Sequence, residues 1–376
     1  MTEDAQTPLS LRWEHRPHWP ALRKEFGGSE TTAAMILSIV TADRPVSYSR
    51  NHNHYVRPRR YKESLYTYAK VTSSADYMAG QGFIIHDKVR PNHLKWQSSM
   101  LATSELVSRT REILSAGPPL VTATPRESII LKNADKEPVD YCDNPTIRRM
   151  RRRVEEMNEA IRGTLLTGVL PAPMVRIFNR TFNRGGRYYA LGGGWQSMSK
   201  EARKLITIDG ESVVEIDYKT LHPALLYAEA GATLPEDCYS IGSWPRPLAK
   251  LGLLVLVNAP TKNKARFAIA HHKTMAEVAV PGSQYALAAA DQLMDDVKAV
   301  HHRIAKYFHS DKGAELMCMD SAIAETVMHL MLLNGVTVLP IHDSFLVQAS
   351  KADLLEEAMQ RAAYETGVEA LQVSFG

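Results

Sequence analysis

The sequence predicts an α+β fold in which an antiparallel sheet, built from hairpins, is covered by amphipathic helices. In the first hairpin, the β-rich runs Leu205–Ile208 and Ser212–Ile216 flank Asp209-Gly210, a dipeptide that favours a two-residue turn. In the second, at 336–349, two apolar runs flank the polar His342-Asp343-Ser344. Much of the remaining chain has helical periodicity, which predicts the helices that cover the sheet.

Composition is that of a globular protein. The chain has 376 residues, 44% hydrophobic and 23% charged, enough for one large or two modest domains. A formal net charge of +4 is compatible with nucleic acid without requiring it. Three cysteines without C-x-x-C spacing favour neither a disulfide framework nor a zinc cluster. Because no signal core and no run of transmembrane length is present, we expect a cytoplasmic protein without membrane contact.

Residues 1–135 are expected to form a mainly helical, nucleic-acid-binding region. Helices are predicted at 29–40, 61–78 and 98–116, with a short strand at 83–85. The segment Ser47–Tyr61 is rich in Arg, His, Asn and Tyr and has no apolar period. This order is compatible with a winged-helix-like module that contacts DNA through arginine and tyrosine. A small helical subdomain with a solvated basic loop explains the pattern equally well.

A basic amphipathic helix is predicted over Thr146–Leu166. Its apolar residues recur at helical spacing: Ile147, Met150, Val154, Met157, Ile161 and Leu165. Five arginines in six residues lie mostly off that stripe: Arg148, Arg149, Arg151, Arg152 and Arg153. A helix laid along a phosphate backbone would show this pattern, as would a helix solvated by its arginines. We favour the first interpretation, since this many arginines exceed what solubility needs.

A glycine-rich segment follows at 176–196 and contains Gly185-Gly186 and Gly192–Gly194. Such glycines let a backbone approach a ligand closely, and they serve equally well in the turns and bulges of a hairpin. The segment also contains three potential hydrogen-bond donors to nucleic acid, which are Arg184, Arg187 and Gln196. Aromatic residues lie beside them in the sequence.

Two carboxylates are expected at rigid positions. Asp217 ends the strand that follows Asp209-Gly210 and precedes a short helix with Pro223 in its first turn. Asp343 lies at or near the tip of the second hairpin, where it would be an ordinary turn residue if it stood alone. Two carboxylates on adjacent strands can bind a pair of Mg²⁺ ions that activate a hydroxyl and stabilise a leaving pyrophosphate.

A cationic face is predicted on the apolar helix at 246–259. Its polar side chains are Arg246, Lys250 and Asn258, and the spacings of four (250 − 246) and eight (258 − 250) put them on one face. Cations on an otherwise buried helix need an anionic partner, for which a triphosphate is a good candidate. The alternative is a pair of residues that snorkel from a core helix.

The C-terminal part is expected to form helices at 283–308, 314–334 and 351–366 and a strand at 368–375 that could pair with the second hairpin. The second of these helices is interrupted by three polar residues: Asp320, Ser321 and Glu325.

In this order the motifs resemble those of family A DNA polymerases. Motif A is similar to DYKTLHPALLYA (217–228), motif B to RPLAK (246–250) followed by Asn258-Ala259, and motif C to IHDSFLVQASKADLLEEAM (341–359). The His-Asp-Ser-Phe version is most similar to single-subunit, phage-type RNA polymerases, which share this fold. The resemblance covers residues 176–376.

The resemblance implies a right-hand polymerase with an antiparallel palm sheet, helical fingers and a thumb. The basic helix, in a segment at 136–170, takes the thumb's place, and residues 171–376 form palm and fingers. Asp217 and Asp343 would be the metal ligands and, with Lys250, the catalytic groups. The implied cofactor is two Mg²⁺ ions, with Mn²⁺ as a substitute.

The resemblance also implies contacts to substrates. Nucleotide-binding residues would be Arg246, Lys250, His222 and Asn258. Nucleic-acid-binding residues would be Arg148, Arg149, Arg152, Arg184, Arg187, Gln196 and His342, the last near the primer terminus.

Three positions depart from the family's pattern. Family A enzymes usually carry Glu where this chain has Ser344, and Glu again where it has His222. Both polymerase groups place Tyr-Gly or a similar aromatic where this chain has Asn258-Ala259. We hypothesise a preference for deoxynucleotides, because His222 is bulky enough to crowd a 2′-hydroxyl. Equal rates of ribonucleotide and deoxynucleotide incorporation would remove this hypothesis.

The expected function is template-directed nucleotidyl transfer without proofreading, with DNA synthesis favoured. The partners would be a DNA primer–template or single-stranded template and dNTP or NTP substrates; protein partners are unknown. One alternative is a primer-independent RNA polymerase or primase, supported by Ser344-Phe345. Another is a non-catalytic DNA-binding replication protein, against which the intact acidic and basic motif residues argue. A small solitary polymerase of this kind would suit a phage or mobile element.

Overall fold

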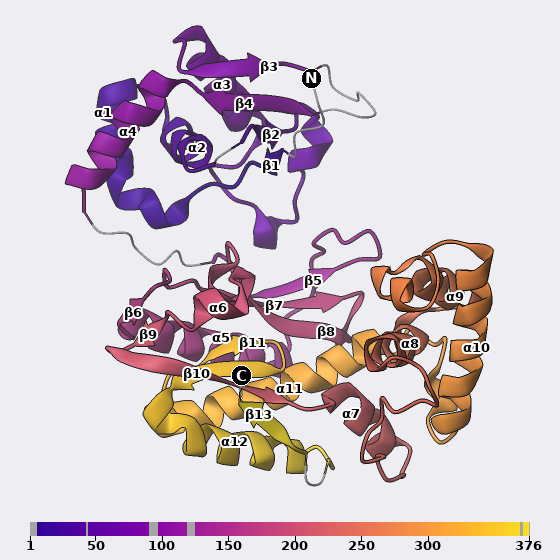
Figure 1. The fold of residues 1–376 in the computed structure, drawn as a ribbon. Coiled ribbons are helices and arrows are strands. Elements are labelled where there is room, and N and C mark those ends of the chain that lie inside the picture. The colour runs from indigo at the N-terminus through magenta and orange to yellow at the C-terminus, as the bar shows by residue number, and fades with distance from the viewer. Residues whose placement is uncertain (1–5, 43, 90–96, 119–124, 369–370, 376) are drawn as a thin grey trace. The chain divides into compact units, whose positions relative to one another are not determined.

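The computed structural model describes residues 6–42, 44–89, 97–118, 125–368 and 371–375. The chain divides into two compact units (Figure 1). Unit 1 comprises Met1–Glu127 and Pro138–Tyr141, and unit 2 comprises Ser128–Glu137 and Cys142–Gly376.

Unit 1 is a small sheet packed with helices. In order across the sheet, the strands are β1 (Thr7–Pro8), β2 (Val46–Tyr48), β4 (Ser98–Ala102) and β3 (Ile84–Asp87). The first pair is parallel and the other two pairs are antiparallel. The helices are α1 (Trp19–Phe26), α2 (Glu30–Val40), α3 (Tyr68–Gly80) and α4 (Ser104–Ala116). Helix α2 forms the centre of this core, since all its residues after Glu30 are buried.

Ser29 caps α2 by accepting a hydrogen bond from the Thr32 backbone, as its sequence predicts. Two other helix predictions in unit 1 are wrong in extent. Residues 98–102 form β4 rather than helix, because pairing with β2 and β3 overrides a weak local preference. Residues 61–67 precede α3, which begins only after its cap, Thr67. The winged-helix-like arrangement stays a prediction.

Unit 2 contains an antiparallel sheet that carries both predicted carboxylates. The strands run in the order β11 (Leu339–Ile341), β12 (Ser344–Gln348), β10 (Glu211–Tyr218), β9 (Thr207–Ile208) and β6 (Leu166–Thr167). Both predicted hairpins are confirmed, because β9 joins β10 and β11 joins β12 through two-residue turns. The final strand, β13 (Val373–Phe375), pairs with β10 and not with the second hairpin as predicted. The register sets Asp217 opposite Ser344.

A second sheet in unit 2 has the order β5 (Ile129–Lys132), β7 (Met174–Asn179) and β8 (Thr181–Ala190). The glycine-rich segment is therefore largely a hairpin, which was one of its two interpretations. Gly185 and Gly186 have positive φ where the register of β7 and β8 shifts, and a Cβ on Gly186 would lie 2.5 Å from the ring of Phe178. These glycines accommodate the protein's own side chains.

The helices of unit 2 are α5 (Pro145–Gly163), α6 (Lys200–Arg203), α7 (Leu221–Glu229), α8 (Arg246–Asn258), α9 (Lys262–His271), α10 (Gln284–Val300), α11 (Gly313–Leu333) and α12 (Ala352–Tyr364). Helices α8, α9 and α10 pack on one another at one end of the unit (Figure 1). Helix α11 contacts β8, α12, α5 and α7 and is the central helix of unit 2. Within the described part of the chain, α11 alone is long and apolar enough to cross a membrane, and these contacts explain its apolar character.

Two helix ends in unit 2 differ from prediction. Helix α10 stops at Val300, well before residue 308, because the buried His301 bonds the Tyr227 hydroxyl and the Cys238 carbonyl, each at 2.9 Å. Helix α5 stops at Gly163, so that Leu165 lies outside the apolar stripe and is 64% exposed. The other five predicted stripe residues of α5 are buried.

Candidate active site

Asp217 and Asp343 line the same cavity. Asp217 is the next-to-last residue of β10, a central strand held by β12 on one side and by β13 on the other. Asp343 lies with His342 in the two-residue turn between β11 and β12. The Tyr218 backbone N–H donates to the Asp343 carbonyl at 3.3 Å, which ties the turn to the end of β10. The cavity has a volume of about 180 Å³ and is otherwise walled mainly by residues of α7 and α8.

The electrostatics of Asp217 suit a cation site. Burial, followed by the negative charges of Asp343 and Glu215, raises the pKa of Asp217 to about 6, against the opposing effect of Lys250. A cation beside Asp217 would offset this cost of ionising it. The described residues contain no cluster of three or more His, Cys, Asp or Glu side chains that could enclose a metal. Two carboxylates nevertheless fit Mg²⁺, which typically takes its other ligands from water and substrate phosphates.

A second carboxylate on β10, missed in the sequence, fixes the hairpin. Ser344 is buried, and its hydroxyl donates to Glu215 Oε1 at 2.9 Å. Arg203 donates to Glu215 Oε2 through Nε at 3.0 Å and Nη2 at 2.8 Å. Glu215 lies two residues before Asp217, so strand alternation puts both side chains on one face of β10. That alternation was the available signal for Glu215, but its link to Ser344 requires the register.

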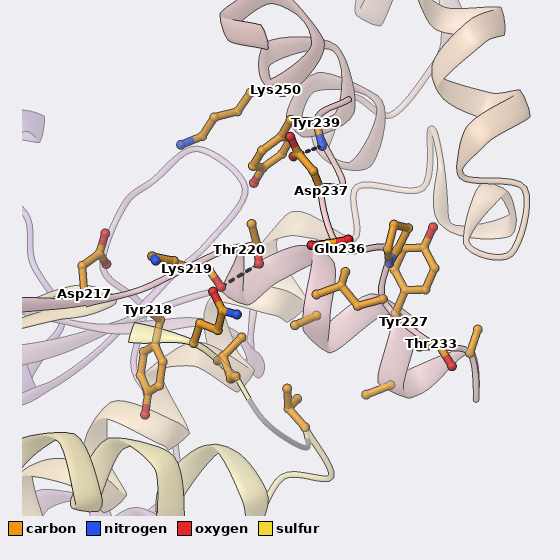
Figure 2. A pocket seen from close by; sticks show the side chains of 18 of the residues that line it. Asp217, Tyr218, Lys219, Thr220, Tyr227, Thr233, Glu236, Asp237, Tyr239 and Lys250 are labelled. Carbon is orange, nitrogen blue, oxygen red and sulfur yellow. Dashed lines mark hydrogen bonds between the residues drawn. The ribbon is translucent and has the colours of Figure 1, made fainter. Parts of the chain in front are cut away.

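The two predicted cations of α8 line a larger cavity of about 1050 Å³. Asp217, Tyr239 and Lys250 line both cavities. Figure 2 shows these three side chains in the larger one. Lys250 is exposed, has no ion-pair partner among the described residues, and lies 5.6 Å from the centre of the Tyr239 ring. Arg246 is also exposed and pairs with Asp237 at 2.5 Å. The helix is thus less buried than expected, and both of its cations line this cavity.

His222 and Asn258, the other predicted nucleotide contacts, differ in position. His222 lines the smaller cavity, and its Nε2 lies 2.7 Å from Asp320 Oδ2. Asn258 lines neither cavity described here. Its amide donates to the Leu254 carbonyl at 2.8 Å, and a Cβ on Gly313 would collide with it. Asn258 therefore packs α8 against the start of α11.

Arg184, Arg187 and Gln196 are engaged inside unit 2. Arg184 pairs with Asp311 at 2.5 Å, and Arg187 pairs with the buried Asp320. The Gln196 amide donates to two backbone carbonyls and accepts one backbone N–H, which braces the β7/β8 hairpin against β11. These side chains were expected to contact nucleic acid, and the structure gives each of them a partner within the protein.

His342 adjoins Asp343 at the hairpin tip. It has a positive φ of 61°, and its ring lies 5.4 Å from that of Tyr189. Burial lowers the pKa of His342, and the positive charge of Arg187 lowers it further. A neutral imidazole is therefore present at neutral pH.

Helix α5 presents free arginines. Arg148, Arg149 and Arg152 are exposed and have no acidic partner in the described part of the chain. Their neighbours Arg151 and Arg153 pair with Asp143 at 2.9 Å and Glu156 at 3.2 Å.

No protein-family model and no curated protein sequence matches the chain. Among solved structures, it is similar to the POL domain of Pol1 from M. smegmatis in complex with DNA primer-template and dNTP. The TM-score is 0.39 and the identity 13%, over 61% of this chain and 51% of that one. The matched region thus spans about half of that polymerase domain's length.

Proposed function

We propose that the protein is a template-directed nucleotidyltransferase that extends a nucleic-acid strand, with DNA synthesis favoured. One observation carries the proposal. Asp217 near the end of β10 and Asp343 in the β11/β12 turn line a single cavity with Lys250 of α8. Two anionic groups beside a free cation suit a substrate that brings both a divalent metal and a polyphosphate.

The residues divide the chemistry between them. Asp217 and Asp343 would hold Mg²⁺, or Mn²⁺ in its place. When bound, two such ions activate the 3′-hydroxyl and stabilise the leaving pyrophosphate. Lys250 stabilises negative charge on the phosphates, and Arg246 adds a second cation one helical turn away once it leaves Asp237. The β10/β12 pairing and the Glu215–Ser344 bond hold the carboxylates in place before substrate arrives.

Nucleic-acid binding is assigned to other surfaces. The unpaired arginines of α5 would contact phosphates along the strand, as a polymerase thumb does. Helices α8–α10 take the role of fingers and the β10–β12 sheet that of the palm. His342, next to Asp343, is assigned to the primer terminus, and unit 1 to a further nucleic-acid contact.

A primer-extension assay tests the proposal. A labelled primer–template is incubated with dNTPs or NTPs and Mg²⁺, using the wild type, Asp343→Ala and Asp217→Asn. Extension should require metal and both carboxylates. The matched control is Asp353→Asn, an exposed carboxylate on α12, which should extend normally. No metal-dependent extension by the wild type under any combination would refute the proposal and favour a non-catalytic DNA-binding role. Extension that survives both carboxylate substitutions would refute the assignment of Asp217 and Asp343 as the catalytic groups.

A primer-independent RNA polymerase or primase is the second candidate, favoured by the His342-Asp343-Ser344-Phe345 sequence. Product analysis with and without primer separates the two, since a primase makes a labelled product from NTPs on template alone.

A further inference from the structure

We propose that Asp320 is a positioning residue for sugar selection, which locks His222 into the wall of the cavity so that deoxynucleotides are preferred. The inference rests on the proposed function and deepens it. It is carried by a network of three side chains from separate elements, a fully buried Asp320 of α11 with the partly buried His222 of α7 and Arg187 of β8.

Asp320 is the anchor of this network. Its side chain is fully buried in α11, a largely apolar helix. Arg187 donates to it through Nε, at 3.0 Å from Oδ2 and 3.2 Å from Oδ1, and also through Nη2. A buried carboxylate is tolerated only when it is paired and hydrogen-bonded, so Arg187 meets the requirement for charge compensation. Asp320 does not line either cavity described here, which separates it from the carboxylates of the proposed active site.

The contact from Asp320 to His222 is the functional one. His222 Nε2 lies 2.7 Å from Asp320 Oδ2 and 3.3 Å from Arg187 Nη2. The carboxylate can only accept, so in this shorter contact Nε2 carries the proton and donates to Asp320. Rotating the ring away would break this bond inside the protein, where an unmet polar group is costly. His222 is thereby held in one orientation at the cavity wall.

The order of groups in a nucleotide places the sugar beside His222. Lys250 attracts the phosphates and the two carboxylates border the reacting phosphate, so the next group along the molecule is the sugar. The rest of the cavity wall is mostly apolar, formed by Leu253, Leu254 and Tyr239, among others. A fixed imidazole at this wall leaves less room for a 2′-hydroxyl than a mobile one would. Asp320 thus acts on the substrate through His222.

The test measures kcat/KM for a dNTP against the matching NTP in primer extension. His222→Ala should lower the dNTP/NTP ratio by about tenfold or more, in the range expected for a small change in the shape of a pocket. Asp320→Asn should lower it in the same direction by about 3- to 10-fold, as loss of one hydrogen bond predicts. The double variant should be no less selective than His222→Ala, because both changes act through one side chain.

Two further variants keep the test decisive. Glu325→Gln alters another α11 carboxylate, which pairs with Arg176 and does not touch His222, so it should change both substrates equally. His222→Phe keeps the bulk but loses the bond to Asp320, without altering the buried carboxylate itself. A wild-type ratio in His222→Phe would overturn the positioning role of Asp320, and a wild-type ratio in His222→Ala would overturn selection at this wall. If the wild type extends primers with equal efficiency on both sugars, the inference fails while the proposed function stands.

Discussion

Asp217→Asn is expected to make the protein more stable and inactive. The pKa of Asp217 rises from an ordinary 3.8 to about 6 in the folded protein. A carboxyl group whose pKa is higher in the folded state destabilises that state when it is ionised. The cost is absent below pH 3.8, grows as the pH rises toward 6, and is complete above it.

The size of the effect follows from the same pKa values. The difference between 3.8 and about 6 corresponds to about 3 kcal/mol, at 1.36 kcal/mol for each pKa unit. Asp217 is only half-buried, and solvent screening reduces this to about 1–2 kcal/mol. Asparagine has a similar shape and no charge. In metal-free buffer at pH 7.5 the free energy of unfolding of the variant should therefore exceed that of the wild type by about this amount.

Urea unfolding followed by tryptophan fluorescence measures the difference, in EDTA and in Mg²⁺. The advantage of the variant should disappear below pH 4. Mg²⁺ should stabilise the wild type by about 1.4 kcal/mol at ten times its dissociation constant, and the variant less. Asp353→Asn is the control and should show neither effect. Lower stability of Asp217→Asn than wild type in EDTA at pH 7.5 would refute the electrostatic reasoning.

Three further predictions concern the surroundings of the carboxylates. Ser344→Ala should cost about 1–2 kcal/mol in urea unfolding, because Glu215 loses a buried donor while it keeps Arg203; no change would show that the bond does not hold the hairpin. Lys250→Ala should raise the KM for the nucleotide more than Arg246→Ala does, since Arg246 already pairs with Asp237; the reverse order in steady-state kinetics would contradict this. Replacing Arg148, Arg149 and Arg152 of α5 together by alanine should weaken primer–template binding. It should also make the slope of log K against log salt shallower by about 2.7, at about 0.9 for each phosphate contact. An unchanged slope in fluorescence anisotropy would exclude these arginines from the interface.

Local sequence was enough for the elements that carry the candidate site. Asp209-Gly210 specifies a tight turn, and both of its residues adopt the positive φ that such a turn needs. The polar residues 342–343 between two apolar runs likewise become the turn that holds Asp343. The spacing of Arg246 and Lys250 placed both on one side of α8, where both line one cavity. These features follow from short-range rules, because turn chemistry and helical period act over a few residues.

Other local predictions failed where distant partners decide. Residues 98–102 became a strand because two other strands flank them, and α10 stopped early because His301 has partners on other elements. In both cases tertiary contacts outweigh a local preference of well under 1 kcal/mol for each residue.

Only the tertiary structure shows which partners the charged residues have. By sequence, Arg184 and Arg187 are candidates for nucleic-acid contact, yet each is bonded to a carboxylate more than a hundred residues away. The hydrogen bond between Ser344 and Glu215 also joins residues that are far apart in the sequence, here by 129 positions. A charged side chain looks alike in a sequence whether it faces solvent or a buried partner. The difference is set by burial and register, because removing a charge from water is favourable only where the fold supplies a counter-charge.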